Sequence, residues 1–176
     1  MKQTKKLVLA AMFLALALVL PFLTGQIPQV GSMLCPMHIP VLLCGFFCGG
    51  PWGLAVGALA PLSRSFVLGM PPLFPTALCM SFELAVYGLV AGMVYRRLKS
   101  TRVNIYLALL SALVAGRVVW GMMMFLCMGL SGGSFTFAAF LAGAVTGAAP
   151  GIVLQLVLIP LLVMLLDRPG ITAGKD

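Results

Sequence analysis

Apolar residues dominate the chain in long runs, which proline, glycine and charged residues interrupt at intervals. A helix needs about 20 apolar residues to cross the hydrocarbon core of a bilayer, because each residue adds only about 1.5 Å. This pattern predicts an all-α membrane protein with six transmembrane helices, at residues 6–24, 36–49, 51–69, 75–95, 103–128 and 136–166. The second segment is short, and the last is long enough to hold a loop helix before the true span.

Composition supports a lipid-embedded protein. Hydrophobic residues make up 62% of the 176 residues, charged residues only 8%, and the mean hydropathy is +1.16. Such a chain is unsuited to water, and its length predicts one integral-membrane domain covering residues 1–176. The basic start and first apolar run could also belong to a secretory signal. No small-x-small cleavage site follows that run, so a retained first span is the simpler interpretation.

The distribution of basic residues predicts how the helices are oriented. There are eleven Lys and Arg against three Asp and Glu. Apart from Arg64 and Arg117, the basic side chains cluster at the two chain ends and in one loop: Lys2, Lys5, Lys6, Arg96, Arg97, Lys99, Arg102, Arg168 and Lys175. The loops near 25–35, 69–75 and 129–135 have no Lys or Arg. The positive-inside rule therefore predicts both termini on the cytoplasmic side, and the clustering argues against nucleic-acid binding.

Four polar side chains lie inside the predicted spans at a similar height. Glu83 precedes the cytoplasmic Arg96 by a stretch of helix about 20 Å long, which places it in the outer half of the membrane. The same count places three other side chains at this height: Arg64 when counted from Trp52, Arg117 from Arg102, and Gln155 from Arg168. We therefore expect these four to meet at a shared aqueous pocket near the extracellular surface.

The charges in this layer suggest a ligand. An ionised side chain facing lipid costs at least about 2.5–3.5 kcal/mol, so these groups should face the bundle interior. Arg64, Glu83 and Arg117 together carry one excess positive charge, which a monoanionic ligand would neutralise. The alternative is structural: Glu83 bridges Arg64 or Arg117, Gln155 ties two helices together, and no ligand is involved.

Three further side chains are candidates for substrate contact. His38 begins the second predicted helix, Tyr87 follows Glu83 by one turn, and Trp120 follows Arg117 on the same helix face. Aromatic rings could enclose the apolar part of a small molecule, although each is also typical of helix packing.

No enzymatic, cofactor or metal site is predicted. The chain has one histidine, a single carboxylate within its spans, and no GxSxG, HExxH or phosphate-loop motif. Five scattered cysteines include no CxxC pair, and Cys35 and His38 form only a lone CxxH. Uphill transport would therefore need an ion gradient or an energised partner.

Several segments together resemble a known family. They are AMFLA in the first span, PMHIPVLLCGFFCGGPWGLAVGALAPL, the loop GMPPLFP, and the helix MSFELAVYGLVAG. This combination resembles the substrate-binding S components of energy-coupling factor (ECF) transporters, the vitamin importers of prokaryotes. The resemblance implies a six-helix subunit of the cell membrane that captures a vitamin from outside. It then passes the vitamin on through a membrane coupling subunit driven by two cytoplasmic ATPases.

The resemblance also suggests roles for particular residues. Ala11 and Ala15 match the alanine motif by which the family's first helix contacts the coupling subunit. The segments HIPVL and GMPPLFPTA are most similar to the pantothenate-type branch, in which Arg64 or Arg117 would meet the vitamin carboxylate. Folate, another vitamin or a modified-nucleobase precursor remain alternatives. So do a small structural or assembly membrane protein and a solitary ion-coupled carrier.

Overall fold

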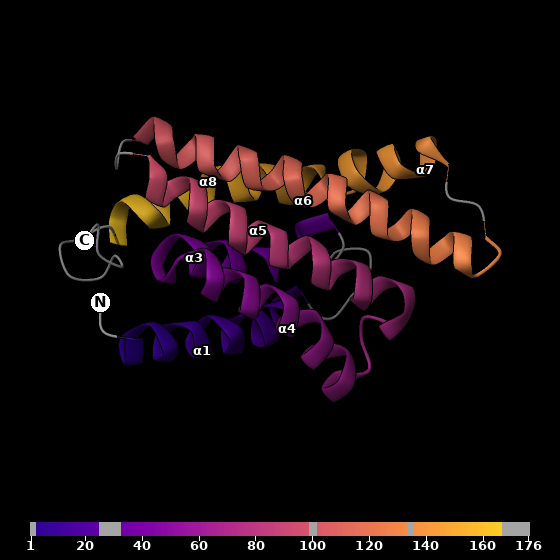
Figure 1. Cartoon of the computed structure of the whole chain (residues 1–176), viewed down its shortest axis with the longest axis horizontal. Helices are drawn as coiled ribbons and strands as arrows, with labels where there is room; N and C mark the ends of the chain where they lie inside the picture. Colours follow the sequence, from indigo (N-terminus) through magenta and orange to yellow (C-terminus); the bar gives the residue numbers. More distant parts are fainter. Residues whose placement is uncertain (1–2, 25–32, 99–101, 134–135, 167–176) are drawn as a thin grey trace.

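The computed structural model describes residues 3–24, 33–98, 102–133 and 136–166 (Figure 1). These residues form helices, with no strand among them. The elements are α1 (Gln3–Val19), η1 (Leu20–Thr24), α3 (His38–Cys48), α4 (Gly50–Leu68), η2 (Leu73–Ala77), α5 (Leu78–Arg97), α6 (Arg102–Leu130), α7 (Phe137–Leu141), η3 (Ala142–Thr146) and α8 (Ala149–Leu166). The predicted all-α fold is confirmed for the described residues.

Four stretches are long and apolar enough to cross a membrane, by length and composition: Gln3–Phe22, Leu73–Arg97, Arg102–Leu130 and Ala149–Leu166. Helix α3 has 11 residues and is about 16 Å long, too short to cross a bilayer alone. Helix α4 has 19 residues, but its glycines, prolines and Arg64 lower its hydropathy. The segment predicted as the last span divides into α7, η3 and α8. The count of six spans and the orientation therefore stay predictions.

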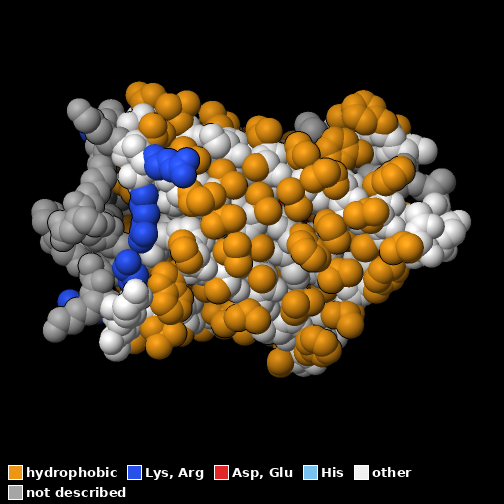
Figure 2. Space-filling view, viewed as in Figure 1, with side chains coloured by type: hydrophobic (Ala, Val, Ile, Leu, Met, Phe, Trp, Pro, Cys, Tyr) orange, Lys and Arg blue, Asp and Glu red, His pale blue; other side chains and the backbone are white. Residues whose placement is uncertain are grey.

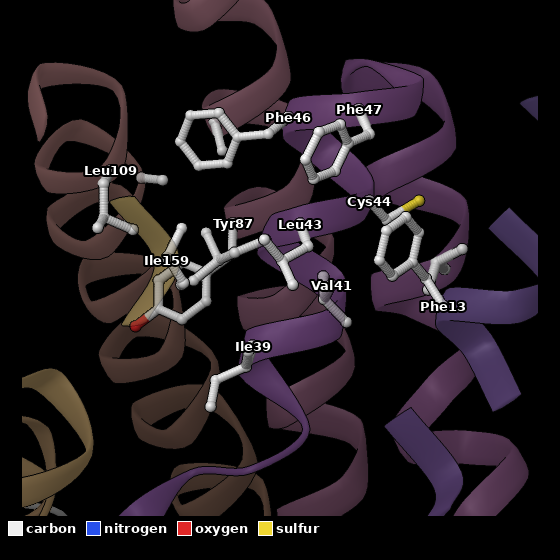
Figure 3. Close-up of a cluster of buried hydrophobic side chains, with 14 of the residues drawn as sticks. Phe13, Ile39, Val41, Leu43, Cys44, Phe46, Phe47, Tyr87, Leu109 and Ile159 are labelled. Carbon is white, nitrogen blue, oxygen red and sulfur yellow. The ribbon is translucent and has the colours of Figure 1, made fainter. Parts of the chain in front are cut away.

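Helix α3 lies at the centre of the bundle, and each of its residues is buried. It contacts α1, α4, α5 and α8, while α6 packs against α5 and α8. The core includes side chains from all of these elements (Figure 3). Phe13 of α1 stacks on Phe47 of α3, with ring centroids 6.2 Å apart, and Tyr87 of α5 lies among Ile39, Leu109 and Ile159. The short α3 thus joins the two sides of the bundle.

Helices α4 and α5 run antiparallel with their backbones in close contact. A Cβ atom added at Gly53 would lie 2.6 Å from the carbonyl oxygen of Gly88. A Cβ atom added at Gly57 would also meet the backbone of Leu84, and one added at Gly92 would meet the backbone of Gly50. Small residues at four-residue spacing allow this approach, and they fix which residues of the two helices are level.

The break between α3 and α4 is stabilised from α5. Gly49 has φ of 98°, a left-handed conformation that favours glycine, and α4 begins directly after it. Arg96 donates a hydrogen bond from Nη2 to the carbonyl oxygen of Cys48 at 2.7 Å, so its guanidinium caps the C-terminus of α3.

The described basic side chains outside the bundle interior gather at one end of the molecule (Figure 2). That end carries the start of α1, the end of α5 and the start of α6: Lys5, Lys6, Arg96, Arg97 and Arg102. Most of the remaining surface in Figure 2 is apolar, as expected for contact with lipid. Other parts of the predicted pattern lie outside the described residues: Lys2, Lys99, Arg168, Lys175 and residues 25–32.

Candidate functional site

Glu83 lies at the centre of a buried polar group. It projects from α5 with 1% of its surface exposed. Its Oε1 atom lies 3.0 Å from Nη1 of Arg117 on α6 and 3.6 Å from Nε2 of His38 on α3. The structure therefore brings together three of the predicted site residues, each from a different helix.

Tyr87 adjoins this group, and Gln155 is a further buried polar side chain, carried by α8. Tyr87 is fully buried one turn after Glu83, and its ring centroid lies 5.3 Å from that of His38. Gln155 of α8 is also fully buried. One turn before it, a Cβ atom at Gly151 would lie 2.6 Å from the carbonyl oxygen of Met33, which precedes α3. Gln155 therefore lies on the inward face of α8, which contacts α3 and α6.

We call His38, Glu83, Tyr87, Arg117 and Gln155 the polar cluster. Several of its buried atoms have no hydrogen-bond partner within the described ranges: Nδ1 and Nε2 of His38, Oε1 of Glu83, Oη of Tyr87, Nε of Arg117, and both amide atoms of Gln155. The close contact between Glu83 and Arg117 is thus an ion pair without hydrogen-bond geometry. A buried polar atom without a hydrogen bond costs about 1–3 kcal/mol, and the cluster has both donors and acceptors of this kind, so a polar molecule that bonds to them would be stabilised.

Arg64 lies apart from the polar cluster, contrary to expectation. Its Nη1 atom donates to the carbonyl oxygen of Leu18 at 2.8 Å, and its guanidinium lies 5.3 Å from the ring centroid of Phe22. Both partners belong to the N-terminal helical segment, not to α5.

The register between α4 and α5 explains this difference. Gly57 is level with Leu84, so Arg64, seven residues further along α4, is level with about residue 77. Its Cα atom therefore lies about 9 Å further along the bundle axis than that of Glu83. The predicted common height of Arg64 and Glu83 was wrong. The height of Arg64 was counted from Trp52 and that of Glu83 from Arg96, but Trp52 is level with about residue 89 of α5 and not with Arg96. Without Arg64, the charges of Glu83 and Arg117 cancel.

Trp120 turns toward the C-terminal part of the chain. Its ring stacks on Phe140 of α7 with centroids 6.3 Å apart, and a Cβ atom at Gly143 would lie 2.7 Å from it. These contacts place Trp120 between α6 and the segment formed by α7 and η3, and its part in binding stays a prediction.

Cys35 was not among the predicted site residues, yet it contacts the polar cluster. Nη2 of Arg117 lies 3.9 Å from its Sγ atom. Its φ of 48° is unusual for a residue other than glycine. The CxxH spacing with His38 is the sequence signal that places Cys35 beside the polar cluster. Among the described residues, no three His, Cys, Asp or Glu side chains group as metal ligands would.

Ala11 and Ala15 are both exposed on the outer face of α1. The opposite face of the helix, with Ala10, Phe13 and Ala17, is buried in the bundle. The two alanines are therefore accessible to lipid or to another membrane subunit.

Comparison with models of known protein families gives a match over most of the chain. The sequence model of a family described as "ECF transporter, substrate-specific component" matches residues 5–163. No curated protein and no solved structure matches the chain. The family match covers every residue of the polar cluster, and also Arg64, Trp120 and the two exposed alanines of α1.

Proposed function

The chain belongs to the family of ECF transporter substrate-specific components, and from this premise we propose that it binds a vitamin-like micronutrient from outside a prokaryotic cell. It delivers this cargo through an ECF transmembrane coupling subunit, powered by two partner ATPases. We place it in the plasma membrane with six spans and both termini in the cytoplasm. The gathering of Lys5, Lys6, Arg96, Arg97 and Arg102 at one end supports this orientation.

The buried atoms of the polar cluster that lack a hydrogen bond are the observation that carries this proposal. Glu83 can accept a hydrogen bond from a ligand hydroxyl or amide, while Arg117 and Tyr87 can donate one. Gln155 and His38 can do either. A ligand that pairs these atoms removes their desolvation cost, and this gain favours the bound state.

Arg64 is the residue to which we assign a ligand carboxylate. It is 5% exposed, and within the described parts of the chain it forms no ion pair with an acidic side chain. Arg117 is already paired with Glu83, so Arg64 is the buried cation that gains most from an anion. Pantothenate fits this division, because its carboxylate lies at one end and its hydroxyl groups at the other. We therefore propose pantothenate as the cargo to test first, with its polar end at the cluster.

Titration calorimetry of the detergent-purified protein against a panel of vitamins tests the proposal. We expect one tight ligand, and we expect Arg64→Gln to weaken it about 10- to 150-fold, the loss of a charged hydrogen bond worth about 1.5–3 kcal/mol. Arg97→Gln, at the basic end, is the matched control and should leave affinity unchanged. Equal affinity of Arg64→Gln and wild type would refute the role of Arg64. If no vitamin in the panel binds, cargo binding itself is refuted.

Docking of the coupling subunit is proposed through Ala11 and Ala15. Because Ala11 is exposed, Ala11→Trp should leave the fold and ligand binding intact while abolishing uptake in cells. Val157→Trp, on the exposed face of α8, is the control and should preserve both activities. Loss of both binding and uptake in Ala11→Trp, or of neither, would contradict this assignment.

A further inference from the structure

Two buried cysteines meet between α5 and α6. Cys79 lies in the first turn of α5 and Cys127 in the last turn of α6. Cys79 donates its thiol hydrogen to Sγ of Cys127, with the two sulfur atoms 3.7 Å apart. Their exposed fractions are 0% and 3%, and neither contributes to the polar cluster.

From this contact we propose that Cys79 and Cys127 are a dithiol redox site that closes to a disulfide joining α5 to α6. A disulfide holds its sulfur atoms about 2.05 Å apart, so the two must approach by roughly 1.7 Å. Rotation about the Cα–Cβ bonds moves sulfur atoms on this scale. The inference is independent of which cargo the protein binds.

The oxidant is a disulfide-bearing molecule on the outer side. The thiolate of one cysteine attacks its sulfur–sulfur bond, forming a mixed disulfide and releasing one thiol. The second cysteine then displaces the other half as a thiol. Overall, two electrons and two protons pass from the cysteines to the oxidant. Figure 1 shows the start of α5 and the end of α6 away from the basic end, where an outside environment would be oxidising.

The position of this pair links it to the polar cluster. Glu83 follows Cys79 by one turn, so both lie on the face of α5 that meets α6. Element η2, which connects α4 to α5, contacts both α5 and α6. A disulfide at this end would hold together the two helices that carry Glu83 and Arg117, and would restrict their separation.

Thiol counting on the full-length, detergent-purified protein tests the proposal. The protein is treated with 2,2′-dipyridyl disulfide, a small apolar oxidant, and then denatured, labelled with a maleimide and measured by intact mass. Starting from five free cysteines, we expect the wild type to lose two thiols and two hydrogens without retaining a pyridyl adduct. Peptide mapping should identify the Cys79–Cys127 link.

Variants separate this pair from the other cysteines. Cys127→Ser should form no link and should retain a pyridyl adduct at most. Cys44→Ser is the matched control, because Cys44 and Cys48 lie one turn apart on α3, and it should still lose two thiols. Oxidation should raise the midpoint of thermal unfolding in the wild type and in Cys44→Ser, but not in Cys127→Ser. A wild type that keeps all its thiols, carries separate adducts at Cys79 and Cys127, or links other cysteines would overturn the proposal. The result for the wild type alone decides whether Cys79 and Cys127 form a disulfide, even if a variant fails to fold.

Discussion

Gly88 is the position at which the packing of α4 against α5 can be tested most directly. A Cβ atom there would lie 2.7 Å from Cα of Gly53 and closer still to the Gly53 carbonyl group. Carbon atoms pack best at about 3.5–4.0 Å, so in Gly88→Ala the helices must separate by roughly 1 Å. The obstructing atoms are helix backbone, which cannot rotate away as a side chain can.

Overpacking of this kind costs about 1–3 kcal/mol. For a chain of this length, 1 kcal/mol lowers the unfolding midpoint by roughly 2–4 °C, so we expect Gly88→Ala to unfold roughly 2–12 °C below wild type. A fluorogenic maleimide can report unfolding in detergent, because all five cysteines are buried in the folded protein.

Gly129→Ala is the matched control for this experiment. Gly129 is an exposed glycine of α6, and a Cβ atom added there has no neighbour within 4 Å. The methyl group should change stability by no more than about 0.5 kcal/mol. If Gly88→Ala and Gly129→Ala unfold at the same temperature, the close contact between α4 and α5 is refuted, and with it the register that separates Arg64 from Glu83.

Two further predictions concern contacts between helices. Glu83→Gln and Arg117→Met should each lower the free energy of unfolding by about 3–5 kcal/mol, because each leaves its partner buried and unpaired. The double variant should lose clearly less than the sum of the two single losses. If the losses measured by thermal unfolding are instead additive, the two side chains do not interact. Arg96→Ala should cost about 1 kcal/mol more than Arg97→Ala, because only Arg96 has the bond to the Cys48 carbonyl oxygen described above. Equal unfolding midpoints for these two variants would show that the cap contributes nothing.

Several features could be predicted from the sequence because they depend on local physics. Helix-length apolar runs and the proline and glycine residues between them predicted the all-α fold, since backbone groups in lipid must bond within their own segment. Burial of Glu83 beside a cation followed from the cost of a lone charge in lipid, and Arg117 was one of two predicted partners. His38 and Tyr87 were named as neighbours of the site, and both lie in the polar cluster.

Only the tertiary structure decided how the helices are aligned against each other. The rise per residue gives a height within one helix, but it does not show which residues of two helices are level. The backbone contacts of Gly53 with Gly88 and of Gly57 with Leu84 set that register, and they move Arg64 away from Glu83 toward Leu18. The meeting of Cys79 and Cys127, 48 residues apart, likewise depends on how α5 and α6 pack. Such contacts arise from the shapes of two surfaces together, which the pattern along one chain segment does not contain.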